Sequence, residues 1–326
     1  MSGPFAIGVD VGGTRLKAGL VDDRGAVLVE TVRDTPARTS TPEVLEDAVV
    51  GVVVELLGRA EGPVAAVGIG AAGFVDAERG VVVFAPHLPW RDHPLRDRLA
   101  ERLDVPVLVD NDANAAGWAE HRFGAGQGET HLAVVTLGTG IGGAVITHGR
   151  LQRGRRGLAG EFGHQQMVPG GRPCECGHDG CWEQYVSGSV VGRAGQELVR
   201  AGGAPARALD ELCGGDPARL TGEHVTRAAR AGDPASVAVL AEVGERLGEG
   251  LAGVVAALDP GRVVVGGGLS EAGELLLRPA RTALSRRLVG GAHRSVPDVV
   301  AARLGARAGL VGAADLARGT AGGGGG

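Results

Sequence analysis

The sequence predicts an α/β protein built from two related domains. Predicted strands alternate with predicted helices along much of the chain, which is the pattern of α/β architectures. A unit of strand, Gly/Thr turn and strand occurs twice, at residues 5–21 and again at residues 131–147. This weak internal repeat suggests two domains that face each other across a cleft, and 326 residues are enough for both.

The first domain is expected to span residues 1–110. Its first strand is an apolar run, a turn at residues 22–25 joins the next two strands, and Pro42 suits the first position of a long helix. The predicted strands are residues 5–10, 16–21, 26–32, 64–70 and 106–109, and the predicted helices are residues 43–60 and 94–103.

The second domain is expected to span residues 111–320 and to be more helical, with a last helix that packs back on the first domain. The glycine-rich residues 321–326 cannot pack and are expected to form a disordered tail. The predicted strands are residues 131–137, 144–147 and 262–265, and the clearest helices are residues 183–201, 221–231 and 234–258, with a further helix after residue 268.

Composition excludes several classes of partner. The net charge is −5 and no basic run occurs, which argues against a nucleic-acid surface. No signal peptide and no apolar run long enough to span a membrane is visible, and four cysteines do not make a disulfide framework. We therefore expect a cytoplasmic enzyme with no nucleic-acid or membrane partner.

The first glycine turn, Asp10-Val-Gly-Gly-Thr14, follows a strand. Gly12 and Gly13 let the backbone approach a phosphate and donate N–H groups to it, and Thr14 adds a hydroxyl. Asp10 could hold Mg²⁺ through water, because hard cations take oxygen ligands. An ordinary hairpin turn is the alternative interpretation.

The second glycine turn spans residues 138–143. Its glycines match the GxGxxG pattern, but the turn leads into a strand rather than a helix, which disfavours a dinucleotide-binding fold. Two copies of one strand–turn–strand unit fit better as two glycine turns that bind one polyphosphate from opposite sides.

Asn111 and Asp112 follow a short strand and precede a helix. Asp112 could simply cap that helix, because Asp and Asn are favoured N-cap residues. The functional alternative is a carboxylate placed to accept a proton from a substrate hydroxyl.

One histidine and three of the four cysteines lie within 18 residues. A set of three Cys and one His is typical of structural zinc sites. The expected ligands are His164, Cys174, Cys176 and Cys181. Three buried thiols without a metal are the alternative, and His178 and Cys213 are left outside the ligand set.

Two glutamates flank this cluster, and they are suited to accept hydrogen bonds from the hydroxyl groups of a polyol. Glu161 precedes His164 by three residues, but the nearby glycines make a helix unlikely there. Glu183 follows Cys181, and its alternative interpretation is a charged residue early in a helix.

Taken together, these motifs resemble the ROK family of sugar kinases and repressors, and within it the bacterial glucokinases. The cysteine–glycine motif is highly specific, whereas the glycine turns are not. The motifs that carry the resemblance are Asp10-Val-Gly-Gly-Thr14, Gly70-Ala-Ala-Gly73, Asn111-Asp-Ala-Asn114, residues 137–143, Glu161-Phe-Gly-His164, residues 174–183 and Gly266-Gly-Gly268.

The resemblance implies an actin-like (ribonuclease H-like) ATPase fold, with a hexose and ATP in a cleft between two domains. Asp112 would be the general base on the sugar's 6-hydroxyl, and His164 would serve both zinc and sugar. The sugar would contact Gly73, Asn111, Asp112, Glu161, His164 and Glu183. ATP and Mg²⁺ would contact Asp10, Gly12, Gly13, Thr14, Gly138, Thr139, Gly140, Gly266 and Gly267. Zinc would be held by His164, Cys174, Cys176 and Cys181.

Glucose is the expected substrate, and a homo-oligomer (dimer or tetramer) is the expected assembly. His87 stands where related glucokinases usually carry Asn, and Arg15 stands where Lys is common. Kinases for N-acetylmannosamine, fructose or allose therefore stay open, as does polyphosphate in place of ATP. A sugar-sensing regulator is the contrasting class, but no DNA-binding domain precedes the first strand at Phe5.

Overall fold

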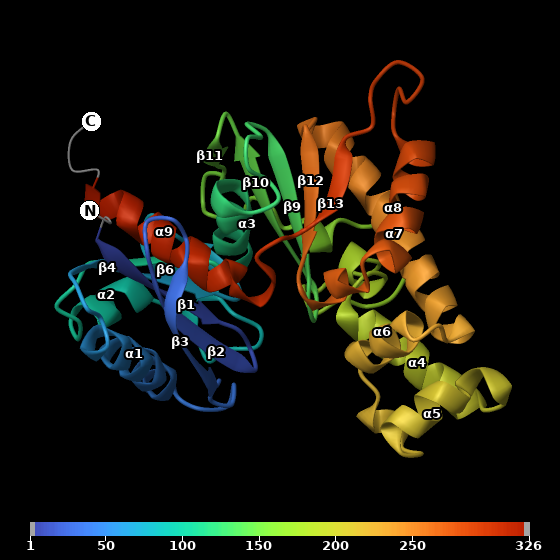
Figure 1. Cartoon of the computed structure of the whole chain (residues 1–326), viewed down its shortest axis with the longest axis horizontal. Helices are drawn as coiled ribbons and strands as arrows, with labels where there is room; N and C mark the ends of the chain where they lie inside the picture. Colours follow the sequence, from blue (N-terminus) through green and yellow to red (C-terminus); the bar gives the residue numbers. More distant parts are fainter. Residues whose placement is uncertain (1–3, 323–326) are drawn as a thin grey trace. The chain divides into compact units, whose positions relative to one another are not determined.

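The computed structural model describes residues 4–322, which fold into two compact units (Figure 1). Within the described residues, the first unit comprises 4–128, 144–160 and 306–322, and the second comprises 129–143 and 161–305. Both units combine sheets with helices, as predicted.

The first unit is built on a five-stranded sheet with strand order β3-β2-β1-β4-β8. β1 pairs antiparallel with β2 and parallel with β4, so that Asp10 lies opposite Lys17 on one side and Gly70 on the other. The strands are β1 (Phe5–Val11), β2 (Arg15–Val21), β3 (Val27–Asp34), β4 (Val64–Ala71) and β8 (Val107–Asn111).

The two faces of this sheet carry different residues because side chains alternate along a strand. Ile7 and Val9 point into an apolar core that they share with Leu45 and Val49 of one helix. The opposite face carries Gly8 and Asp10, and the last helix of the chain packs there (Figure 1). The helices of this unit are α1 (Pro42–Gly58), α2 (Leu95–Ala100), α3 (Asp112–Phe123) and α9 (Ala308–Gly322).

Glycines allow α9 to lie directly on the sheet. A Cβ at Gly8 would be 1.7 Å from the carbonyl oxygen of Leu310, and a Cβ at Gly68 would be 1.8 Å from that of Ala313. A Cβ at Gly312 would be 1.7 Å from the carbonyl oxygen of Ala115 in α3. Any side chain at these positions would push the elements apart, so the backbones of α9, α3 and the sheet are fixed by close contact.

A small sheet, not anticipated from the sequence, lies in the first unit in the order β5-β6-β7. Its strands are β5 (Phe74–Asp76), β6 (Val81–Phe84) and β7 (Arg91–His93). They are only three or four residues long, too short for an alternating pattern to be visible. Leu88 and Trp90, in the segment between β6 and β7, are buried and anchor it to the core.

The second five-stranded sheet has the order β11-β10-β9-β12-β13, and the boundary between the units falls within β10, after Gly143. β12 runs parallel to both β9 and β13. The strands are β9 (Leu132–Leu137), β10 (Ile141–Thr147), β11 (Arg150–Leu151), β12 (Arg262–Gly266) and β13 (Asp298–Ala301).

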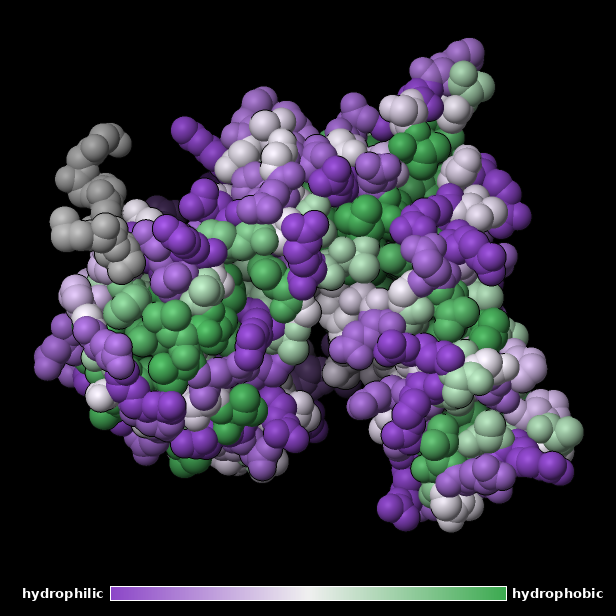
Figure 2. All heavy atoms as spheres, viewed as in Figure 1, coloured by the Kyte–Doolittle hydropathy of each residue, from purple (hydrophilic) through white to green (hydrophobic). Residues whose placement is uncertain are grey.

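The helices of the second unit enclose an apolar core of mainly Val, Leu and Ala side chains. They are α4 (Gly188–Ala201), α5 (Arg207–Cys213), α6 (Gly222–Arg230), α7 (Pro234–Leu258) and α8 (Glu274–Arg287). Polar side chains cover much of the face seen in Figure 2, with smaller apolar areas between them. Within residues 4–322, no helix is both long and apolar enough to cross a membrane.

Several boundaries differ from those expected. The structure divides after residue 128 rather than residue 110, because α3 packs against α9 and β4 and so belongs to the first unit, as α9 does. The helix expected from residue 183 begins at Gly188, where Ser187 accepts a hydrogen bond from the Val190 N–H. Residues 321 and 322 of the expected tail end α9, and residues 323–326 lie outside the described part.

Candidate active site

Two partly buried carboxylates meet in the first unit. Asp112 begins α3, and its Cα lies 3.5 Å from where a Cβ of Gly70, the strand partner of Asp10, would be. Gly309 of α9 packs on Asp10, since its Cβ would lie 2.7 Å from the Asp10 Cγ. The closely packed glycines of this unit therefore bring Asp10 and Asp112 together.

Their neighbourhood makes both carboxylates weaker acids. Burial, the largest cause, and the charge of Asp112 together raise the pKa of Asp10 to about 7, against the opposing charge of Lys17. Burial also raises the pKa of Asp112, although the Ala113 N–H, 2.9 Å from its Oδ1, lowers it. Such a pair attracts a proton or a cation, which suits both proton acceptance and Mg²⁺ binding.

Asn111, and not Asp112, caps α3. The Asn111 Oδ1 accepts a hydrogen bond from the Asn114 N–H at 2.9 Å, and its Nδ2 donates to the Gly73 carbonyl at 2.9 Å. Gly73 has φ +130°, and a Cβ there would lie 2.4 Å from the Phe84 carbonyl oxygen. The capping interpretation of Asp112 is therefore wrong, and its carboxylate is available for another role.

The turn after β1 is a tight hairpin in which the Gly12 N–H donates to the Arg15 carbonyl at 3.0 Å. Gly13 and Thr14 are exposed at its tip. His87 lies against this tip, because a Cβ at Gly13 would be 2.8 Å from the His87 Cβ. The residue that departs from the usual glucokinase pattern thus lies next to the predicted phosphate turn.

Arg91 holds the segment that carries His87, a role that the sequence did not reveal. Its guanidinium donates to the carbonyl oxygens of Ala85, of Leu88 at 3.0 Å and of Trp90 at 2.6 Å. It also lies 4.3 Å from the centre of the Phe84 ring. Only the folded segment shows this arrangement, since all the acceptors are backbone groups.

Asp110 and Arg153 form a second arrangement that sequence reasoning missed. The Asp110 side chain is 1% exposed, and its Oδ2 lies 2.6 Å from the Nη2 of Arg153. Asp110 precedes Asn111 and Asp112, so the ion pair lies directly behind the predicted base. A carboxylate at a strand end was the available signal, but its partner lies 43 residues away.

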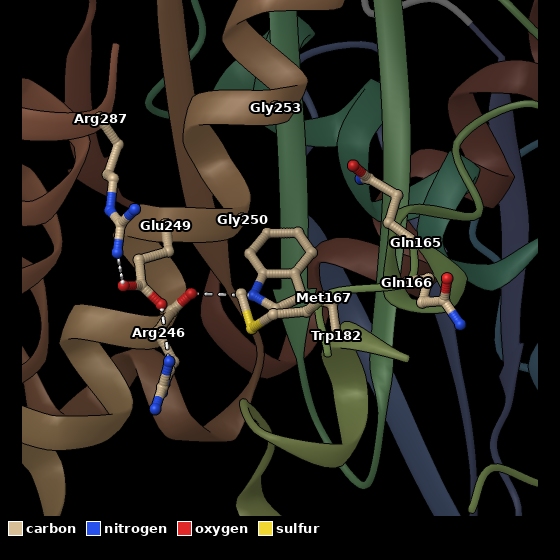
Figure 3. Close-up of a pocket in the computed structure, with 9 residues that line it drawn as sticks. All are labelled: Gln165, Gln166, Met167, Trp182, Arg246, Glu249, Gly250, Gly253 and Arg287. Atoms are coloured by element: carbon tan, nitrogen blue, oxygen red, sulfur yellow. Dashed lines mark hydrogen bonds and ion pairs between the residues drawn. The ribbon is translucent and has the colours of Figure 1, made fainter. Parts of the chain in front are cut away.

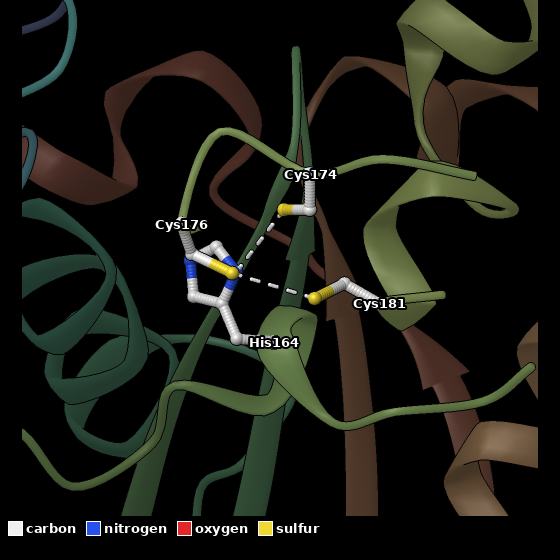
Figure 4. A group of neighbouring side chains, drawn as sticks. All are labelled: His164, Cys174, Cys176 and Cys181. Atoms are coloured by element: carbon white, nitrogen blue, oxygen red, sulfur yellow. Dashed lines mark hydrogen bonds between the residues drawn. The ribbon is translucent and has the colours of Figure 1, made fainter. Parts of the chain in front are cut away.

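In the second unit, the four predicted metal ligands gather at one point (Figure 4). Their donor atoms all lie within 4.8 Å of one another, and three Cys and one His are the donors of many structural zinc sites. Gly177 and Gly180, with φ of +92° and +79°, let the loop turn around them. The residues present therefore fit a zinc ion.

The thiols of this cluster differ in acidity. Desolvation raises the pKa of Cys176, but hydrogen bonds from the backbone and ring of His178 and from the other two thiols outweigh it and lower the pKa to about 6. Burial is the main cause that raises the pKa of Cys174 and of Cys181. A cluster that already favours one thiolate is suited to metal binding.

Both predicted glutamates lie at this cluster. The Glu183 Oε1 accepts a hydrogen bond from the Cys174 thiol at 3.0 Å and lies 3.7 Å from the His164 Nδ1. The Glu161 Oε2 lies 4.0 Å from the His164 Nε2. Both glutamates lie at short 3₁₀ turns rather than in α-helices: Glu161 precedes the turn Phe162–His164, and Glu183 lies within the turn Trp182–Gln184.

Of the predicted nucleotide-binding residues, those in the second unit lie at one end of its sheet, whereas Gly12 and Gly13 belong to the first unit. A Cβ at Gly140 would be 2.5 Å from the Glu183 Oε2, and a Cβ at Gly267 would be 2.4 Å from the Leu137 carbonyl oxygen. The Ser189 hydroxyl donates to the Thr139 carbonyl at 2.9 Å. The second glycine turn, Gly267 and Glu183 therefore share one end of β9 and β12.

A cavity of about 390 Å³ lies next to the Cys/His cluster, since its lining includes Gln165 and Trp182, the neighbours of His164 and Cys181 in the chain (Figure 3). The Trp182 Nε1 donates to the Arg246 carbonyl at 3.1 Å, and a Cβ at Gly250 would be 2.1 Å from the indole, so α7 supports the turn that carries Glu183. No predicted site residue lines the cavity. Its lining residues are Gln165, Gln166, Met167, Trp182, Arg246, Glu249, Gly250, Gly253 and Arg287.

Comparison with known proteins decides the family. The sequence profile of the ROK family matches residues 6–320. The chain belongs to the ROK family. Among its relatives are glucokinases from Streptomyces coelicolor, 46% identical over 96% of this chain and 98% of the relative, and from Thermotoga maritima, 37% identical over 95% and 96%.

Solved structures of ROK proteins agree with this assignment. A ROK glucokinase from Streptomyces griseus, determined in complex with glucose and AMPPNP, is 46% identical and superposes with a TM-score of 0.90 over 97% of this chain and 99% of that chain. The chain therefore has the actin-like ATPase fold with two domains, as the motifs predicted.

Proposed function

We infer that this ROK protein is a glucokinase that transfers the γ-phosphoryl group of ATP to the 6-hydroxyl of glucose. The observation that carries this conclusion is the near-complete match to glucokinases at 46% identity. The geometry supports it, because Asp112 is not used as a helix cap and lies beside a second carboxylate.

We assign the general base to Asp112, which would accept the proton of the sugar hydroxyl. Phosphoryl transfer needs mainly positioning and charge neutralisation, so one carboxylate is sufficient as a base. We assign sugar binding to Gly73, Asn111, Asp112, Glu161, His164 and Glu183.

We assign the phosphates of ATP to the two glycine turns. Backbone N–H groups suit phosphate oxygens, and Asp10, with its raised pKa, suits Mg²⁺. Mg²⁺ would supply charge neutralisation at the transferred phosphoryl group. The residues of this assignment are Asp10, Gly12, Gly13, Thr14, Gly138, Thr139 and Gly140, with Gly266 and Gly267 near the adenosine.

We assign a structural zinc ion to His164, Cys174, Cys176 and Cys181. Four protein ligands leave no open position for a reacting water, so the metal would stabilise the loop that holds Glu183. A cytoplasmic location, a homo-oligomer and the absence of a nucleic-acid partner stay predictions of the sequence.

A coupled kinase assay tests the proposal. The purified protein is offered glucose, N-acetylmannosamine, fructose and allose, each with ATP and with polyphosphate. We expect glucose with ATP to give the highest kcat/KM. Preference for another sugar would direct attention to His87, and no phosphorylation of any sugar would overturn the enzyme assignment.

A further inference from the structure

We propose that Asp110 and Arg153 form a positioning pair that holds the Asn111–Asp112 turn and the loop leading to Glu161 in the arrangement needed for phosphoryl transfer. The proposal rests on the proposed kinase function. Neither residue is assigned to contact substrate; the pair acts through the residues that it holds.

The Asp110 carboxylate is fully engaged. Its Oδ2 accepts from Arg153, with the Nε at 2.7 Å and the Nη2 at 2.6 Å. Its Oδ1 accepts from the Asn111 N–H at 2.8 Å and from the Asn114 Nδ2 at 3.1 Å. A buried anion with three hydrogen bonds and an ion pair is held in one orientation.

The groups on Oδ1 belong to the start of α3. The Asn114 backbone N–H donates to the Asn111 side chain, and the Asn114 side-chain amide donates to Asp110. Asp110 and Asn111 therefore fix both the backbone and the side chain of Asn114. Asp112 lies between Asp110 and Asn114 in the chain. Loss of the Asp110 charge would loosen the turn from which the Asp112 carboxylate projects.

Arg153, the second member of the pair, belongs to the loop of residues 153–160 and holds this loop against Asp110. Its carbonyl accepts from the Ala159 N–H at 3.0 Å, which closes the loop on itself. Gly157, with φ +78°, packs against β5, since a Cβ there would lie 2.0 Å from the Val75 carbonyl oxygen. Glu161, assigned to sugar binding, follows this loop directly in the chain.

Stability alone is a weak reason for such a pair, because well-packed apolar residues often replace buried ion pairs without loss. Asp315 offers a comparison in the same unit. It is 9% exposed and pairs with Arg318 at 3.1 Å. It also accepts a hydrogen bond from the Trp118 Nε1 at 2.9 Å and lies 3.2 Å from the Arg122 Nε, both in the second half of α3 rather than in the turn that carries Asp112. Loss of the Asp315 charge should therefore lower the stability of the fold and leave turnover unchanged.

The test is a double-mutant cycle with Asp110→Asn and Arg153→Gln, plus Arg153→Lys and the control Asp315→Asn. Asp110→Asn keeps the Oδ1 acceptor but turns an NH₂ group toward the guanidinium. We expect each single variant to lower kcat/KM for glucose about 10²-fold, as a misplaced base would, with KM for ATP unchanged. The double variant should recover part of the loss, because two amides can hydrogen-bond each other.

Arg153→Lys keeps the positive charge but loses the planar guanidinium with its paired donors, so it should retain more activity than Arg153→Gln. If Arg153→Gln does not fold, Arg153→Lys replaces it in the comparison. Asp315→Asn should lower Tm with unchanged kinetics. Single variants that fold and keep wild-type kcat/KM would refute the positioning role of the pair.

If the wild type is inactive on every sugar, the proposed kinase function is refuted instead, and hydrogen exchange at residues 110–115 tests the pair. Faster exchange in Asp110→Asn than in the wild type would support the positioning role, and unchanged exchange would refute it.

Discussion

At the scale of single residues, Asp10 and Asp112 are carboxylates in a place that disfavours charge. Burial is the largest cause of the raised pKa of each, and Asp112 also raises the pKa of Asp10. An amide or apolar side chain would be more stable at either position in the ligand-free protein. Mg²⁺ bound at Asp10, as proposed, would relieve the repulsion between the two carboxylates, so their placement suits chemistry better than stability.

The first prediction concerns the base. Asp112→Ala should lower kcat by at least the roughly 10²–10⁴-fold typical of a lost general base, because no other group is assigned to accept the proton. Glucose binding, measured by calorimetry, should largely survive. Turnover close to that of the wild type would refute the role of Asp112.

The second prediction concerns pH and Asp10. The folded pKa of about 7 exceeds the ordinary value of 3.8, so the folded state holds a proton that the unfolded state has lost between these values. Stability therefore falls as pH rises from about 4 to 7, by up to roughly 4 kcal/mol. Asp10→Asn does not titrate, so its stability advantage should grow across this window and then level off.

Urea unfolding of both proteins at a series of pH values, without added Mg²⁺, measures this difference. The comparison cancels the other titrating groups, except for Asp112, which the substitution also relieves. A difference in unfolding free energy that is independent of pH would show that Asp10 is not held in a charge-disfavouring site.

At the scale of elements, the proposed zinc ligands connect the turn at His164 and the loop of residues 174–181 to the turn that carries Glu183. Cys176→Ser should reduce bound zinc and weaken glucose binding about tenfold or more, because the loop would no longer hold Glu183. Cys213→Ser is the matched control, since Cys213 is buried outside the cluster. Metal analysis and calorimetry measure both effects; zinc-free wild-type protein would contradict the assignment.

Helix α9 provides another prediction. Gly312→Ala should destabilise the protein by about 1–3 kcal/mol or more, because its Cβ would meet the Ala115 carbonyl at 1.7 Å. Gly319→Ala lies in the same helix with no atom within 4 Å of the new Cβ, and should stabilise by about 0.5–1 kcal/mol. Equal effects in thermal unfolding would argue against the close packing of α9.

Elements with strong local signals were predictable. The expected helix at residues 234–258 matches α7 (Pro234–Leu258), where Asp233 caps and Pro234 begins the helix. The start of α4 was misplaced because residues 183–187 are helix-compatible in composition, whereas the Ser187 cap was not recognised. The short strands β5 to β7 carry too few residues for any periodic signal.

At the scale of the whole molecule, motifs predicted the fold and the family, and the four predicted metal ligands, His164, Cys174, Cys176 and Cys181, lie close together. Two of the missed features are contacts between distant segments: Arg153 with Asp110, and His87 with Gly13. Such contacts depend on how elements pack. No local pattern encodes them, so only the folded chain reveals which carboxylate supports the base.

The packing of α9 on β1 has a consequence for how a cell makes this protein. Synthesis produces β1 first and α9 last, yet the two lie in backbone contact through Gly8 and Leu310. Residues 161–305 can fold while the chain still grows. The first unit must wait, with one face of its sheet open, until α9 has been synthesised. During synthesis, the unit that carries Asp112 therefore stays incompletely folded for longer, and we expect it to be the one that chaperones and proteases reach.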